Sequence, residues 1–380
     1  MIYLDNAATT PVRREVVEAM WPYFTSEFGN PSSHHEIGEP AALALTQARE
    51  NIAEWLGCRA SEVIFTSGGT EADNLAIKGI ALATPRGKHI VTTAIEHQAV
   101  LESCDYLKRQ HGFEVTVLGV DGEGLVDLDA LAAAVRADTT LVSVMYANNE
   151  VGTVQPIAEI AAIAKKQGAA MHTDAVQAAG WLDLDVSKLG VDALSISGHK
   201  LGAPKGIGVL FVRGRVPLEP LMHGGGQERG NRSGTENVAG AVGLALAARL
   251  SEATREEDAA RVAEIRDGFI EEVLRTVDDA ILTGPRQPRL PNNASFCFPG
   301  TSGESLLLEL AGQGIICSSG SACAAGSDEP SHVLVAMGIK PEVAQTAVRF
   351  SLDGTATAHQ MRVVASALRA ALVSVRKLGA

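Results

Sequence analysis

The sequence lacks a long apolar run. No stretch approaches the ~20 apolar residues that a membrane-spanning helix needs. Residues 1–6 contain neither the basic segment nor the apolar core of a secretion signal. We therefore expect a cytoplasmic protein that does not associate with a membrane.

Positive charge is also scarce. The chain has 32 lysines and arginines against 45 aspartates and glutamates, a net charge of -13 at pH 7. A nucleic-acid-binding surface needs a basic face that displaces counterions from phosphates. The charge balance favours a small-molecule substrate over direct binding of nucleic acid.

Cysteine is sparse, with five residues at positions 58, 104, 297, 317 and 323 and no C-x-x-C pair. This pattern indicates neither a disulfide framework nor a zinc site, so we expect no resident metal. Cys297 and Cys317 lie in apolar strand-like runs, which predicts inert thiols. Cys323 instead lies in a loop of small residues, 318–327, where an exposed thiol can act as a nucleophile.

The chain of 380 residues exceeds the ~250 to 300 residues at which single cores stop growing, so two domains are expected. Short apolar runs alternate with helix-like segments up to a glycine-rich loop at 224–230. This order predicts an α/β domain, residues 16–252, with a mostly parallel mixed sheet flanked by helices. A smaller α+β domain would combine residues 1–15 and 253–380. Strands are expected at 63–66, 89–93, 141–146, 169–173, 194–197, 208–212, 294–298, 315–317 and 347–352.

The apolar run 194–197 leads directly into Gly198, His199 and Lys200. A strand that ends this way delivers a lysine to the sheet edge where α/β proteins form ligand crevices. A lysine that loses its proton on burial is a nucleophile able to form a Schiff base. Taken alone, a solvated loop lysine is the simpler interpretation.

Other strand ends carry polar groups as well. Residues 67–70, Ser-Gly-Gly-Thr, open a helix and can either cradle a phosphate or simply cap the helix. Asp174, with Gln177 three residues later, can hold a ring nitrogen protonated or cap a helix. His97 and Asn149 also follow strands, and their convergence on one sheet edge predicts a ligand site.

Arg349 lies inside an expected strand of the small domain. Its planar guanidinium suits a substrate carboxylate, and a structural ion pair is the alternative.

Taken in order, these motifs closely resemble those of the NifS-like cysteine desulfurases, which are fold type I, class V pyridoxal phosphate (PLP) enzymes. The resemblance runs from about Tyr3 to Leu352. It rests on residues 3–10 (YLDNAATT), 66–74, 96–97, 148–150, 174 with 177, 197–200, 232–235, 318–323 and 329–334. Any one of these motifs is weak evidence, but the ordered set is specific.

The resemblance implies a role for each matching residue. Lys200 would carry PLP, Asp174 would pair with the pyridine nitrogen, Gln177 would bond the ring hydroxyl, and His97 would stack on the ring. Gly69, Thr70, Ser197 and His199 would hold the phosphate, and Thr235 would reach the phosphate of a neighbouring subunit in a homodimer. Asn149, beside the cofactor, and Arg349 would orient the substrate L-cysteine.

The implied reaction removes sulfur from L-cysteine. Lys200 would move protons at the substrate, and Cys323 would take the sulfur as a persulfide, releasing alanine. The sulfur would pass to an acceptor protein of unknown identity, for iron-sulfur cluster assembly or for tRNA or DNA thiolation, and Cys323 could transiently ligate a cluster. A selenocysteine lyase, an aminotransferase or another class V enzyme is the alternative. A non-catalytic sulfur carrier is disfavoured because Lys200, Asp174, His97 and Cys323 are all present.

Two departures from the family pattern concern the C-terminal part. Residues 353–354 are Asp-Gly where the family commonly has Gly-Arg, which we expect to change a helix cap or local charge rather than the chemistry. The chain also ends at residue 380 without the longer tail that iron-sulfur members use to dock a scaffold. The sequence therefore leaves the acceptor open.

Overall fold

The computed structural model describes residues 1–83, 86–319 and 329–378. A seven-stranded sheet organises the larger part, in the order β2-β8-β7-β6-β5-β3-β4. Strands β3 to β7 pair in parallel, whereas β8 runs antiparallel to both β7 and β2. The strands are β2 (Val63–Thr66), β3 (His89–Thr93), β4 (Glu114–Leu118), β5 (Thr139–Ser143), β6 (Ala170–Asp174), β7 (Ala193–Ser197) and β8 (Gly208–Val212). The expected α/β fold with a mostly parallel mixed sheet is confirmed.

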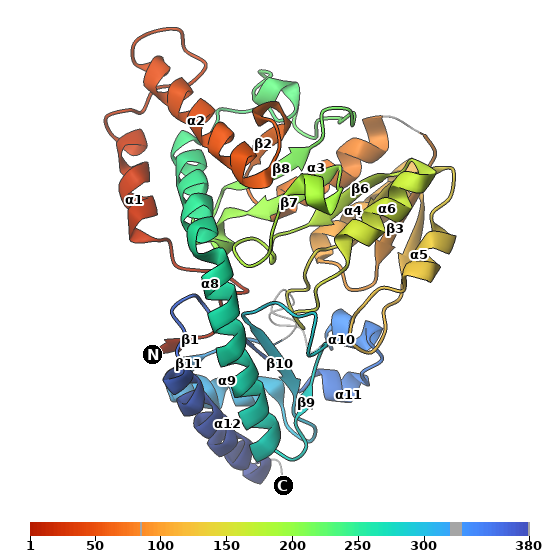
Figure 1. The fold of residues 1–380 in the computed structure, drawn as a ribbon, viewed down its shortest axis with the longest axis vertical. Helices are drawn as coiled ribbons and strands as arrows, with labels where there is room; N and C mark the ends of the chain where they lie inside the picture. Colours follow the sequence, from red (N-terminus) through yellow and green to blue (C-terminus); the bar gives the residue numbers. More distant parts are fainter. Residues whose placement is uncertain (84–85, 320–328, 379–380) are drawn as a thin grey trace.

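Helices cover the two faces of this sheet (Figure 1). The helices of this part of the chain are α1 (Arg14–Met20), α2 (Gly38–Leu56), α3 (Gly69–Ala83), α4 (Gln98–His111), α5 (Leu128–Ala134), α6 (Ile157–Gln167), α7 (Val186–Leu189) and α8 (Val238–Thr276). The central strands are continuously buried, as in β8, where every residue from Gly208 to Val212 is buried. A sheet covered on both faces requires such unbroken apolar runs rather than alternation.

The second part of the chain forms a smaller sheet of β9 (Ile281–Leu282), β10 (Asn293–Cys297) and β12 (Ala347–Ser351), all antiparallel. Its helices are α9 (Gly303–Gly312), α10 (His332–Ala336), α11 (Pro341–Ala344) and α12 (Ala358–Leu378). Phe269 packs edge-on against Phe296 and Phe350, with ring centroids 6.0 and 5.1 Å apart. β1 (Ile2–Tyr3) pairs in parallel with β11 (Ile315–Ile316), so the N-terminus lies beside this part of the chain.

Helix α8 connects the two parts (Figure 1). It is 39 residues long, and Leu244 belongs to the core beneath the large sheet while Phe269 belongs to the core of the small one. Sequence reasoning identified its later turns but not its beginning. Glycines there obscure the helical pattern, and Gly243 lets the helix approach α1 closely, because a Cβ at that position would lie 2.6 Å from the sulfur of Met20.

Two further differences concern strands. β5 ends at Ser143, three residues before the expected end, although the Val144 and Tyr146 N–H groups still donate to carbonyl oxygens of β6. β4 was not expected at all. It is the outermost strand and no residue of it is fully buried, so it lacks the apolar run that marks the inner strands. In the ranges that the structure describes, no helix combines the length and apolarity needed to cross a membrane.

Candidate active site

A cavity of about 530 Å³ lies at the carboxyl edge of the parallel strands and extends to β12 of the smaller sheet. Its lining includes most of the residues that the sequence singled out: Gly69, Thr70, His97, Asn149, Asp174, Gln177, Ser197, His199, Lys200 and Arg349. They come from separate elements spread over 281 positions of the chain, from Gly69 to Arg349. Convergence at one edge follows from the parallel arrangement, which brings successive strand ends together.

Lys200 enters the cavity from the short 3-10 helix η3 (Gly198–Lys200) that follows β7. Its Nζ donates hydrogen bonds to the carbonyl oxygens of Ala7 and Ala8, the latter at 2.7 Å. Gln177 donates from Nε2 to the same Ala7 oxygen at 2.9 Å. Lys200 is therefore a cavity residue held by the N-terminal segment and not a solvated loop lysine.

One end of the cavity is rich in hydrogen-bond donors. Gly69 begins α3, and a helix's first backbone N–H groups have no partner within the helix, which favours an anion there. The backbone must pass close to its neighbours at this point, since a Cβ on Gly69 would lie 2.8 Å from Val176. Thr70 and Ser197 add hydroxyl groups.

Two basic side chains complete this donor-rich end. Burial, reinforced by Lys200 and Lys205, lowers the pKa of His199 to about 4, so its imidazole is neutral at pH 7. Lys205 lines the cavity and brings a positive charge that sequence reasoning did not assign to the site. Its signal was its place five residues after Lys200, in the same glycine-rich turn. The set is suited to a phosphate group.

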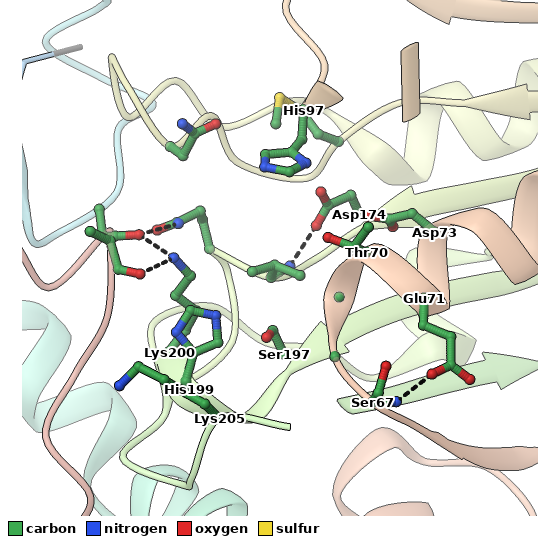
Figure 2. A pocket seen from close by; sticks show the side chains of 18 of the residues that line it. Ser67, Thr70, Glu71, Asp73, His97, Asp174, Ser197, His199, Lys200 and Lys205 are labelled. Carbon is green, nitrogen blue, oxygen red and sulfur yellow. Dashed lines mark hydrogen bonds between the residues drawn. The ribbon is translucent and has the colours of Figure 1, made fainter. Parts of the chain in front are cut away.

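Acidic side chains also line the cavity. Asp174 ends β6, is 5% exposed, and accepts a hydrogen bond from the Val176 N–H at 2.8 Å. Burial raises its pKa, while His97, that N–H and Lys200 oppose the rise. Asp73 of α3 lies beside it (Figure 2), and burial together with the charge of Asp174 raises the pKa of Asp73 well above its usual range. A cationic ring nitrogen next to Asp174 would favour its ionised form.

His97 lies across the cavity from Lys200 (Figure 2). It is the N-cap residue of α4, and its Nδ1 accepts a hydrogen bond from the Ala99 N–H at 3.1 Å. The cap fixes the imidazole ring at the N-terminus of α4, where it lines the cavity.

Arg349 is 1% exposed and reaches the cavity from β12. Its Nη1 donates to the carbonyl oxygen of Asn149 at 2.9 Å, and its Nη2 donates to Oδ1 of Asp5 at 2.8 Å. Arg349 therefore forms the ion pair that the sequence left as the alternative, and it also brings its cationic side chain to the cavity.

One predicted residue that the structure describes does not line this cavity. Thr235 is exposed and is not among the lining residues. Cys323 lies outside the described residues. The described residues on either side of it are anchored at the cavity rim: Ser318 and Arg349 exchange backbone hydrogen bonds of 3.2 and 2.7 Å, and His332 Nε2 lies 3.0 Å from the Glu96 carbonyl oxygen.

The other four cysteines are unsuited to nucleophilic chemistry. Burial raises the pKa of Cys58, Cys104, Cys297 and Cys317 to about 12 in each case, so all four are thiols at neutral pH. Over 1–83, 86–319 and 329–378 no group of three or more histidine, cysteine, aspartate or glutamate side chains is arranged to hold a metal.

The donor set fits PLP. Anion donors match its phosphate, the buried Asp174 matches its pyridine nitrogen, and Lys200 brings an amine to the same cavity. The chain belongs to the family described as aminotransferase class-V, whose model matches residues 2–364, and PLP is the cofactor of this family.

Known proteins extend the likeness over nearly the whole chain. The chain is 48% identical to the cysteine desulfurase IscS of Dictyoglomus turgidum over 378 residues, 99% of this chain and 96% of that protein. The solved structure of a NifS-like protein superposes with a TM-score of 0.91 at 40% identity, covering 98% of this chain and 99% of the other. A structure described as SspA in complex with cysteine gives a TM-score of 0.80 at 38% identity, with 93% and 99% covered.

Proposed function

We propose that this protein is a cysteine desulfurase that removes sulfur from L-cysteine, releases L-alanine and stores the sulfur as a persulfide on Cys323. The observation that carries the proposal is the presence of Lys200, Asp174 and Arg349 in one cavity. Together these side chains provide an amine, a partner for a ring nitrogen and a cation for an amino-acid carboxylate. The similarity to IscS-type and cysteine-bound relatives supports it.

Most of the predicted residues that line the cavity would have a part in this reaction. Thr70, Ser197 and His199, with the Gly69 amide, would bind the phosphate, Gln177 the ring hydroxyl and Asp174 the ring nitrogen. PLP, when bound, supplies an electron-withdrawing ring that acidifies the substrate Cα–H. Arg349 and Asn149 would orient the amino acid, and the Lys200 amine would accept the Cα proton and return a proton to the product.

The sulfur step would belong to Cys323. Its thiolate attacks the substrate sulfur, so an S–S bond forms, the C–S bond breaks, and the electron pair of that bond stays with the substrate carbon. Protonation of the carbon yields alanine. The anchoring of Ser318 and His332 at the cavity rim supports this assignment, as do the high thiol pKa values of the other four cysteines.

A homodimer is part of the proposal. Large apolar side chains are exposed between α1 and the middle of α2: Trp21 is 64% exposed, Phe24 61%, Phe28 67% and Leu43 71%. An apolar patch of this kind on a large protein is typical of an interface with another chain. Exposed Thr235 would reach the phosphate of the neighbouring subunit, making each site shared.

The persulfide sulfur would pass from Cys323 to an acceptor. We propose a cytoplasmic acceptor protein, used in iron-sulfur cluster assembly or in tRNA or DNA thiolation. In the first case Cys323 would transiently ligate a cluster. The IscS name of a relative favours the first. A selenocysteine lyase is the second candidate, because the cavity would bind selenocysteine in the same way.

A paired experiment tests the activity. The cofactor-loaded protein should release alanine from L-cysteine in the presence of a thiol reductant, and the Lys200→Ala and Cys323→Ser variants should each lose this activity. If Cys323→Ser releases alanine as fast as the unmodified protein, the persulfide role is wrong. If selenocysteine is turned over and L-cysteine is not, the protein is a lyase for the selenium compound.

A further inference from the structure

The N-terminal segment Asp5–Thr10, here called the strap, borders the cavity with Ala7 and Ala8. The carbonyl oxygens of Ala7 and Ala8 accept hydrogen bonds from Lys200. At its start the Asp5 carboxylate bonds Arg349. The strap therefore touches both the amine and the cation that the proposed reaction uses.

Arg349 is held at two of its nitrogens. Nη2 donates to Asp5 at 2.8 Å and Nη1 to the Asn149 carbonyl oxygen at 2.9 Å, while the arginine side chain is only 2% exposed. A guanidinium has five N–H donors in one plane, so these two bonds fix the plane and leave donors over for a further acceptor. A long flexible side chain is thereby set in one orientation before any substrate arrives.

The charges around Arg349 identify Asp5 as its partner. A second described acid near Arg349 is Glu150, which accepts a hydrogen bond from Ser331. Burial raises the pKa of Glu150 to about 7, so this group is only partly ionised at neutral pH. Without Asp5 a buried cation would lose its ion-pair partner, which proteins tolerate poorly.

From this geometry we infer that Asp5 is a positioning residue for substrate recognition: it holds Arg349 so that the remaining guanidinium N–H groups bind the α-carboxylate of the amino acid. The inference rests on the proposed function, since that carboxylate is the substrate's. Asp5 acts through Arg349 and does not take part in bond making or breaking.

The backbone of the strap does not depend on the Asp5 carboxylate. The Ala7 N–H donates to the Ser351 hydroxyl at 2.8 Å, and Asn6 Nδ2 donates to the Ser351 carbonyl oxygen at 2.8 Å. The Ala8 N–H donates to the backbone oxygen of Asp5 at 3.0 Å. An Asp5→Asn variant should therefore keep the strap in place while it weakens the hold on Arg349.

The test compares Asp5→Asn, Asp5→Glu and the control Asp353→Asn, which removes a carboxylate whose described bonds are to Thr355 alone. KM and kcat are measured for L-cysteine. Equilibrium affinities are measured from the visible absorbance of the cofactor-loaded protein for L-alanine and for ethylamine, which is alanine without its carboxylate. This pair isolates the carboxylate contact from every other contact.

We expect Asp5→Asn to raise KM for L-cysteine and to weaken L-alanine binding by roughly 10-fold or more, the size of a lost charge-assisted hydrogen bond. The kcat and the affinity for ethylamine should stay within about twofold, Asp5→Glu should recover part of the loss, and Asp353→Asn should match the unmodified protein. Equal losses for L-alanine and ethylamine, an unchanged KM, or a lower KM would each overturn the inference.

The proposed function and the role of Asp5 are tested by different measurements. If the unmodified protein releases no alanine from L-cysteine, the proposed function is wrong. The comparison of L-alanine with ethylamine needs no turnover, so it still decides whether Asp5 and Arg349 recognise a carboxylate.

Discussion

Glu96 precedes the cavity residue His97, and its buried carboxyl should make the stability of the protein depend on pH. It is 0% exposed; its Oε1 accepts hydrogen bonds from the Thr93 hydroxyl at 2.6 Å and the Met145 N–H at 3.0 Å. Its Oε2 is buried with no hydrogen-bond partner in the described parts of the chain. Burial raises the pKa of Glu96 to about 8. The native protein therefore carries this carboxyl protonated at neutral pH.

The ionisation of Glu96 should make the folded protein less stable as the pH rises. Because the folded-state pKa is raised, the protonated carboxyl contributes stability that is complete below the ordinary pKa of 4.5 and is lost as the pH rises through about 8. Each pH unit between these limits costs roughly 1.4 kcal/mol. Between pH 6 and pH 9 the loss is therefore about 2 to 3 kcal/mol. A glutamine at position 96 does not ionise, so the variant should escape this loss.

The assay is urea unfolding of the cofactor-loaded protein at pH 6 and pH 9, with Glu96→Gln compared with the unmodified chain. The exposed Glu264 of α8 gives a matched control, Glu264→Gln. Relative to the unmodified chain, the unfolding free energy of Glu96→Gln should rise by about 2 to 3 kcal/mol between pH 6 and pH 9. The unfolding free energy of Glu264→Gln relative to the unmodified chain should be the same at both pH values. A difference that is the same at both pH values would refute the reasoning.

Three further predictions concern the cofactor, the fold and the assembly. Asp174→Asn should retain PLP less well after dialysis, seen as a weaker visible absorbance, because a neutral amide no longer favours a protonated ring nitrogen. Glu228→Ala should lower the unfolding free energy by about 3 to 5 kcal/mol, measured by urea unfolding, because it strands the mostly buried Arg49, whose two bonds to Glu228 are 2.6 and 2.7 Å long. Leu43→Glu should shift a dimer toward the monomer in analytical ultracentrifugation, since Leu43 is 71% exposed in one chain and the proposed interface would bury it.

The parts of the fold that were predictable from sequence are those with an unambiguous local pattern. β2 and β8 span 63–66 and 208–212, as expected, because both are short, fully buried apolar runs. Helix α12 begins at Ala358, as expected. Polar groups at strand ends were predicted to converge, and Asp174, Asn149 and Lys200 do line one cavity.

The missed features depend on contacts between distant segments. The Arg349–Asp5 pair joins residues 344 positions apart, and neither residue's neighbours in sequence indicate the other. Asp73 lies in the first turn of α3, where an acidic residue is usually exposed, yet packing buries it to 1% exposure beside Asp174. The roles of Thr235 and Cys323 stay predictions. The division of the chain into a large domain, 16–252, and a small domain, 1–15 with 253–380, also stays a prediction.

The most direct test of the central claim follows the sulfur atom. The cofactor-loaded protein is mixed with one equivalent of L-cysteine that carries a sulfur isotope label, without reductant, and then digested and analysed by mass spectrometry. We expect labelled sulfur on the peptide that contains Cys323, and one alanine released for each labelled sulfur atom bound. Alanine released with no label on Cys323, or label on Cys317 or Cys58 instead, would contradict it.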